Sequence, residues 1–173
     1  MRIQTDEKLR KTLYELYVAL FHARQNCPND FNFRRLTTIQ TAFMGIEDFG
    51  WRVTGITPEA LNLLAENNFE IRRLPRLLCR GHKIARNETT RRLFDRDTQV
   101  SLEEFFMTFL ENDQTVIMLN TQNINGATFP EYIEIENPNA ELFPNHGLIG
   151  WKHRKVEREL LRELHTSISR KES

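Results

Sequence analysis

The sequence predicts an α+β fold: a mainly helical single domain with a small antiparallel sheet or hairpin in the C-terminal half. Apolar residues recur at helical spacing through residues 1–112. After residue 113, β-branched and apolar residues flank a turn signal. The chain has 173 residues, of which 39% are hydrophobic, enough for one domain with its own core. We therefore expect one domain over 1–173, helical over 1–112, with a β-hairpin and a C-terminal helix over 113–173.

Capping signals mark two of the expected helix starts. Thr57 is placed as an N-cap, and Pro58 occupies the first helical position. Ser101 and Glu104 form a capping box, in which a hydroxyl and a carboxylate satisfy two helix-end amides. A short strand or packed loop is expected over 49–53. The helices expected before the hairpin cover residues 6–25, about 33–48, 58 to Asn67-Asn68, 73–94 and the stretch after Ser101.

The C-terminal part has strand character. Residues 115–119 are β-branched and apolar, and residues 128–135 alternate between apolar and polar. Asn125-Gly126 is a turn signal between them, so an antiparallel hairpin is expected over about 115–135. Pro130 would place its second strand at an edge, because proline has no amide hydrogen to donate. A loop over 137–147 and a last helix over about 152–168 complete the prediction.

Charge is unevenly distributed although the formal net charge is zero. Residues 70–96 contain nine Arg or Lys and three acids, whereas residues 97–150 contain nine acids and no Arg or Lys. In a helix over 73–94, Arg76, Arg80 and Lys83 would share one face, which like charges oppose. Phosphates, the chain's own acidic segment, or simple solvation would each relieve this repulsion. The candidate nucleic-acid-binding residues are Arg72, Arg73, Arg76, Arg80, Lys83 and Arg86.

We expect a binding or regulatory protein that contacts DNA or RNA through this basic segment. Residues 57–94 resemble a helix–turn–helix only in outline, as a short helix, a turn and a basic helix. A metal-dependent nuclease is the alternative, so catalysis stays open. Its metal would be held either by histidines near the hairpin and the last helix or by carboxylates on a strand, which are otherwise an acidic edge. The residues considered for that site are His82, His146 and His153, or Asp113, Glu131, Glu134 and Glu136.

The two cysteines, Cys27 and Cys79, suit a reducing compartment better than a disulfide scaffold. Cys79 lies three residues before His82, the spacing of a thiolate–imidazole pair or half of a zinc site. A buried structural cysteine is the preferred interpretation, and no metal site is predicted. No phosphate-binding glycine loop or nucleophile elbow occurs, so no cofactor is predicted.

The expected first helix has two apolar rows. Leu9, Leu13, Leu16 and Leu20 form one, and Tyr14, Val18 and Phe21 form the other. One row would face the core, and the other would be covered by the rest of the fold or by a second copy, so a homodimer or other homo-oligomeric interaction module is a further alternative. The longest apolar run has four residues and the N-terminus lacks an apolar core, so we expect a cytoplasmic protein without membrane contact.

Overall fold

The structure is a computed structural model that describes residues 5–44, 52–70, 77–124, 126–143 and 154–170. Its elements divide into two compact units, each made of two separate stretches of chain. Unit 1 comprises residues 1–50 and 84–114, and unit 2 comprises residues 51–83 and 115–173. That the whole chain is one domain, as the sequence predicts, stays a prediction.

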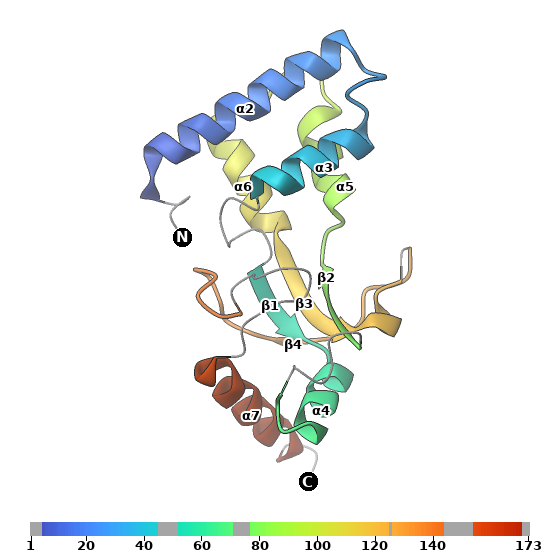
Figure 1. The fold of residues 1–173 in the computed structure, drawn as a ribbon, viewed down its shortest axis with the longest axis vertical. Helices are drawn as coiled ribbons and strands as arrows, with labels where there is room; N and C mark the ends of the chain where they lie inside the picture. The colour runs from blue at the N-terminus through green and yellow to red at the C-terminus, as the bar shows by residue number, and fades with distance from the viewer. Residues whose placement is uncertain (1–4, 45–51, 71–76, 125, 144–153, 171–173) are drawn as a thin grey trace. The chain divides into compact units, whose positions relative to one another are not determined.

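The α+β class is confirmed, with six α-helices and a four-stranded sheet among the described residues (Figure 1). Five helices match expected ones closely, because apolar periodicity and capping are local signals. In α4 and α6, the Thr57 and Ser101 hydroxyls each accept the N-terminal amide hydrogen bond that the caps predict. Residues 45–48 of the expected second helix lie outside the described residues. The matching helices are α2 (Glu7–Asn26), α3 (Phe33–Met44), α4 (Pro58–Glu66), α6 (Leu102–Asn112) and α7 (Lys155–Ser169).

Unit 1 contains α2, α3, α5 (Arg86–Phe94) and α6 around an aromatic core. Tyr17 lies at its centre and stacks on Phe105 with a ring-centroid distance of 4.8 Å. Both apolar rows of α2 contact this core, and only Leu16 among them is notably exposed, at 39%. The row that suggested a homodimer is therefore used within unit 1, while the dimer itself stays a prediction. The fully buried part of the core consists of Leu13, Tyr17, Phe21, Leu36, Leu93, Phe94, Val100, Phe105, Phe106 and Phe109.

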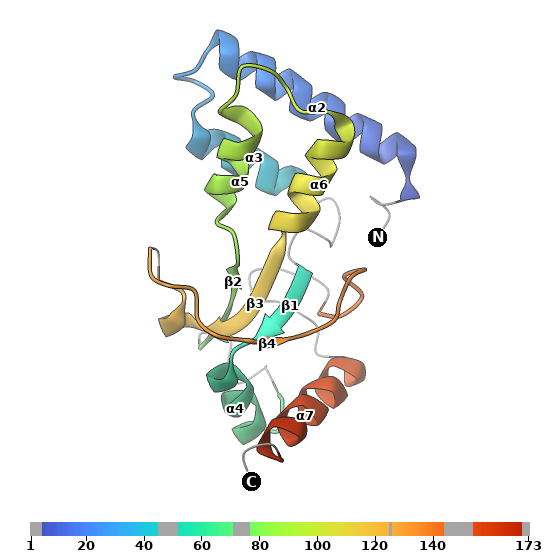
Figure 2. The ribbon, with the colours of Figure 1, turned by 180° about the vertical axis from the view of Figure 1, so that it is seen from behind.

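Unit 2 is built on a mixed sheet with strand order β2-β3-β1-β4 (Figure 2). Its aliphatic core joins side chains of the sheet, such as Ile56 and Ile117, to Leu61 and Leu64 of α4 and Leu161 of α7. Antiparallel pairing of β2 with β3 sets Leu78 opposite Leu119 and His82 opposite Thr115. The strands are β1 (Arg52–Ile56), β2 (Leu78–His82), β3 (Gln114–Leu119) and β4 (Ile133–Glu134).

The predicted hairpin over 115–135 is wrong. The two strands exist, but β3 pairs with β2, and β4 pairs with β1. The 3-10 turn Asn120–Gln122 follows β3 directly, and the turn signal is still used, because Gly126 has a φ of +80°. A local turn motif thus bends the chain without fixing which strands pair.

The edge position that Pro130 predicts for the second strand is confirmed, because β4 is the last strand in the sheet order. The short strand expected near 49–53 is present as β1, with residues 49–51 outside the described residues.

The predicted helix over 73–94 is also wrong over residues 78–82, which form strand β2. The buried strand β3 has backbone hydrogen-bonding groups on both edges, and β2 satisfies those on one side. The helix begins only at Arg86. Arg80 and Lys83 therefore do not share a helical face, and the described part of 57–94 is not a helix–turn–helix.

Candidate functional site

The described members of the predicted basic segment make internal contacts. Arg80 donates through Nη2 to the carbonyl oxygen of Phe143 at 2.8 Å. Lys83 places Nζ 4.4 Å from the centroid of the Tyr132 ring. Both belong to unit 2, whereas Arg86 belongs to unit 1. Arg72, Arg73 and Arg76 lie outside the described residues.

Arg86 lies at the N-terminal end of α5 and donates to the Thr41 hydroxyl at 3.3 Å. Burial lowers the pKa of Arg86, and the nearby charge of Asp113 opposes that shift. Arg86 remains charged at neutral pH, because the pKa of a guanidinium is normally far above it.

The residues considered for metal binding do not form a cluster in the described part of the chain. No group of three or more His, Cys, Asp or Glu side chains that suits a metal occurs there. Cys79 and His82 are three apart on a strand, so they point to opposite faces, and the thiolate–imidazole pair that was considered as an alternative is not formed. His146 and His153 lie outside the described residues. The nuclease alternative thus gains no support from these residues and stays a prediction.

Cys79 differs from the expectation that it is buried. Cys27 is exposed, and Cys79 is half-buried on β2. Burial raises the pKa of the Cys79 thiol, and a hydrogen bond with Asn123 partly opposes this. A thiol with a raised pKa is a poor nucleophile, in keeping with the structural interpretation.

The chain's acidic segment neutralises only part of the basic segment within unit 1. Arg96 pairs with Glu104 at 2.7 Å, which joins the two segments. Arg92 pairs locally with Glu88 at 2.6 Å, one turn away on α5. Within their bounds, α3 and α5 carry five arginines and a single acid, Glu88. The five are Arg34, Arg35, Arg86, Arg91 and Arg92.

Three side chains from three helices of unit 1 meet beside this basic surface. Phe33, the first residue of α3, has the guanidinium carbon of Arg24 from α2 at 3.9 Å from its ring centroid. The guanidinium carbon of Arg91 from α5 lies 4.5 Å from the same centroid. We call Arg24, Phe33 and Arg91 the arginine–phenylalanine cluster. Each contact of this kind contributes about 0.5–1 kcal/mol at an exposed position.

The cluster leaves hydrogen-bond donors available. A guanidinium has five N–H groups, and Arg24 uses one of them on the carbonyl oxygen of Phe31 at 3.0 Å. The Arg91 side chain is 57% exposed, and its nearest carboxylate, on Asp95, is 4.0 Å away. That distance exceeds a hydrogen bond. Two cations are thus held in place by an aromatic ring while most of their donors stay available.

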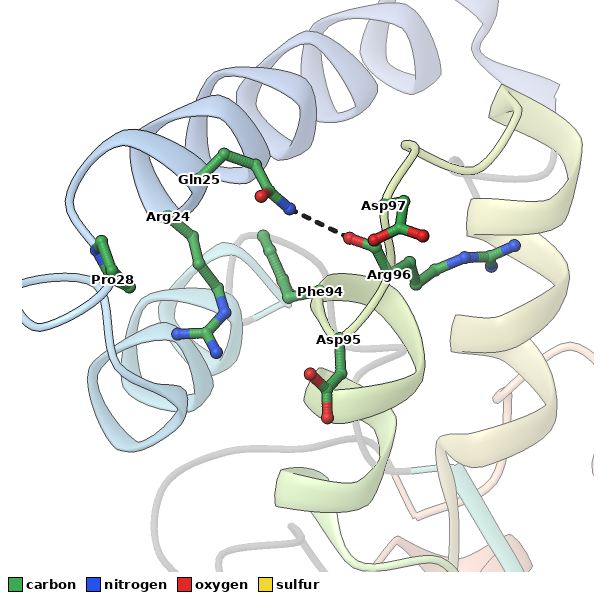
Figure 3. Close-up of a pocket in the computed structure, with 7 residues that line it drawn as sticks. All are labelled: Arg24, Gln25, Pro28, Phe94, Asp95, Arg96 and Asp97. Atoms are coloured by element: carbon green, nitrogen blue, oxygen red, sulfur yellow. Dashed lines mark hydrogen bonds between the residues drawn. The ribbon is translucent and has the colours of Figure 1, made fainter.

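A pocket of about 410 Å³ opens beside the cluster (Figure 3). Figure 3 shows Arg24 on one side of Phe94 and Asp97 on the other, with Asp95 below. Gln25 donates through Nε2 to the carbonyl oxygen of Arg96 at 2.9 Å, which ties α2 to the loop after α5. The lining residues are Arg24, Gln25, Pro28, Phe94, Asp95, Arg96 and Asp97.

Sequence analysis missed Arg24 and Phe33 because no spacing rule connects residues on different helices. The dense arginines of 86–96 were the only available signal, and they pointed to α5 alone.

Comparison of the chain with family models, with curated proteins and with solved structures found no match. In the described residues, no helix is both long enough and apolar enough to cross a membrane.

Proposed function

We propose that this protein binds nucleic acid through the arginine–phenylalanine cluster and the adjoining basic surface of α3 and α5. The observation that carries the proposal is the placement of two guanidinium groups on the single ring of Phe33. Guanidinium groups bind phosphate through paired N–H···O bonds, and these are stronger than hydrogen bonds between neutral groups.

Fixed guanidinium groups favour binding because less side-chain freedom is lost when a ligand arrives. Arg24 is fixed twice, by the Phe33 ring and by its hydrogen bond to Phe31. The surrounding surface adds positive charge, and among the described residues the exposed side chain of Arg34 has no acidic partner. Such a surface would bind the phosphate backbone and release counterions as it does so.

The test is a fluorescence titration of short single-stranded and duplex oligonucleotides at about 50 mM and about 200 mM salt. We expect affinity to fall steeply with salt. In the double variant Arg24→Ala/Arg91→Ala, we expect affinity to fall at least about tenfold, with a salt slope smaller by about 2 if each arginine contacts one phosphate.

The matched control is Lys8→Ala/Lys11→Ala, which removes the same charge from exposed positions of α2 in the same unit. Its effect should be several-fold smaller. Phe33→Leu keeps both charges but removes the ring, so we expect an intermediate loss of affinity. Failure of the natural protein to bind either oligonucleotide, or equal losses in the two double variants, would overturn the proposal.

A further inference from the structure

The pocket in Figure 3 shares one residue, Arg24, with the arginine–phenylalanine cluster. Arg24 belongs to both, since its guanidinium lies over Phe33 and also lines the pocket. Arg91 does not line the pocket, but its guanidinium lies 4.0 Å from Asp95, a lining residue one helical turn away. A phosphate bound by Arg24 would therefore place the rest of its nucleotide at the mouth of the pocket.

The pocket presents hydrogen-bond acceptors opposite Arg24. Gln25 uses its amide nitrogen on Arg96, so its Oε1 is left to accept. Among the residues that the structure describes, the carboxylate of Asp95 contacts only the Arg91 guanidinium, at 4.0 Å. Asp97 is exposed, with no hydrogen bond or ion pair to another described residue. Arg96 adds no donor there, because its side chain extends away from Arg24 and pairs with Glu104 (Figure 3).

We infer that the pocket takes an unpaired nucleobase that carries an exocyclic amino group, and that the preferred ligand is a single strand. This inference rests on the proposed function. Adenine and cytosine present amino donors at N6 and N4, which carboxylates accept, whereas thymine and uracil present the O4 oxygen at the same edge. In a duplex these groups are already paired, and flipping a base out costs a few kcal/mol.

The size of the pocket suits this ligand. A volume of about 410 Å³ lies within the range of about 300–1,000 Å³ that is usual for small-molecule sites. Phe94 lines it and is itself 1% exposed, packed against Tyr17 at a centroid distance of 5.3 Å. Phe94 is therefore fixed by the core and holds the backbone of the neighbouring lining residues Asp95 to Asp97 in place.

The experiment compares the affinities of single strands of A, of C and of U, and of an A·U duplex, at one salt concentration. We expect the A and C strands to bind about tenfold more tightly than the U strand, the value of one hydrogen bond to a charged group. In Asp95→Asn/Asp97→Asn the ratio of A to U affinity should fall to about one, because amides can also donate to O4.

The ratio is the decisive readout, because removing two negative charges raises the affinity for every phosphate polymer alike. Glu111→Gln changes an exposed carboxylate of α6 that does not line the pocket, and it should leave the ratio unchanged. Equal binding of all strands, or an unchanged ratio in the double variant, would overturn the base pocket. If Arg24→Ala/Arg91→Ala weakened binding at least about tenfold while the base pocket failed its test, the proposed function would stand. Absence of binding to any strand would overturn both.

Discussion

Unit 1 packs around aromatic rings, whereas unit 2 packs aliphatic side chains of a sheet against two helices. The contrast extends to the loops. In unit 1 neutral hydroxyls bind the backbone at the two ends of the loop after α5, while the Arg96–Glu104 ion pair of that loop is solvent-exposed. Tyr17 donates to the carbonyl oxygen of Leu93 at 3.0 Å and accepts from the Val100 amide at 3.1 Å. Tyr14 donates to the carbonyl oxygen of Val100 at 2.6 Å. The aromatic side chains that fill this core therefore also fix its loop.

In unit 2 the backbone at Phe143 is held by charged side chains. Glu157 of α7 is fully buried, and its carboxylate accepts from the Phe143 amide at 3.1 Å and from the guanidinium of Arg154. Arg80 of β2 donates to the carbonyl oxygen of the same Phe143. Both backbone groups of one buried residue, which has a φ of +53°, are thus bound by ionised side chains.

This difference teaches that the two units should respond differently to acid. Neutral hydroxyls keep their hydrogen bonds throughout the acidic range, because the pKa of tyrosine is near 10. A buried carboxylate loses its charge when protonated and with it the ion pair. Acid should therefore weaken unit 2 through Glu157, while the tyrosine contacts of unit 1 persist.

The largest effect is expected from Glu157→Gln. The change removes the charge that pairs with Arg154 and replaces one acceptor oxygen by a donor. In place of Oε1 this donor would face both the Phe143 amide and the Arg154 guanidinium, and in place of Oε2 it would face the Arg154 amide. We expect a loss of about 3 kcal/mol in the free energy of unfolding, at the low end for a broken buried pair because Arg154 is partly exposed. Denaturant titration measures the loss. Hydrogen exchange should place it in α7 and the sheet rather than in α2 and α6.

Glu157 also makes the free energy of unfolding depend on pH. Burial alone would raise the pKa of Glu157, but the hydrogen bonds from Arg154 and Phe143 and the charge of Arg154 outweigh it, so the pKa lies below its ordinary value. The stabilisation is therefore complete above the unfolded-state value of 4.5 and is lost as pH falls through the lower folded value. In Glu157→Gln this loss of stability in acid should be absent. Glu159→Gln changes an exposed carboxylate that pairs with Lys155, so it should keep the loss in acid. Its free energy of unfolding should fall by less than about 0.5 kcal/mol.

A smaller effect is expected from Tyr17→Phe in unit 1. The ring stays in the aromatic core, but the carbonyl of Leu93 and the amide of Val100 lose their buried partner. We expect a loss of about 2 kcal/mol that is the same at pH 4 and pH 7. Tyr14→Phe, which removes a single part-buried bond, is the matched comparison and should lose about 1 kcal/mol. A loss for Tyr17→Phe that grew in acid would contradict the contrast between the units.

The extent to which the sequence predicted this structure follows the range of each signal. Thr57 and Ser101 marked helix starts correctly because a cap acts on amides three residues away. Strand β2 was mistaken for helix because Leu77, Leu78 and the residues around them fit a helical pattern as well as a strand. Its true partner, β3, lies more than thirty residues further along the chain.

The candidate site was beyond local signals for the same reason. Arg24 and Arg91 come from different helices and meet only because Phe33 lies between them in the folded unit. The basic run over 70–96 indicated the right helix, α5. It also indicated Arg80, whose side chain donates a hydrogen bond to the Phe143 carbonyl oxygen within unit 2. Composition therefore indicated a charge imbalance, and tertiary packing decided which arginines remain available.

The smallest effects are expected at the two caps, which repeat the contrast between the units. Ser101 in unit 1 is exposed and caps only the Glu104 amide, so Ser101→Ala should lose about 0.5–1 kcal/mol. Thr57 in unit 2 is fully buried, caps the Ala60 amide and also donates to Gln122 Oε1 at 2.9 Å. Thr57→Ala should lose about 1.5 kcal/mol, because the second hydrogen bond is lost as well.

Conservative variants separate the cap from the packing at these two sites. Thr57→Ser keeps the hydroxyl and removes only a methyl group, so it should recover most of the loss caused by Thr57→Ala. Ser101→Asp should be at least as stable as the natural protein at neutral pH, because a carboxylate caps well and favours the positive end of α6. Thermal unfolding followed by circular dichroism measures all four variants. If Thr57→Ala lost no more than Ser101→Ala, the bond to Gln122 would contribute nothing, and the greater dependence of unit 2 on buried polar contacts would not extend to its helix cap.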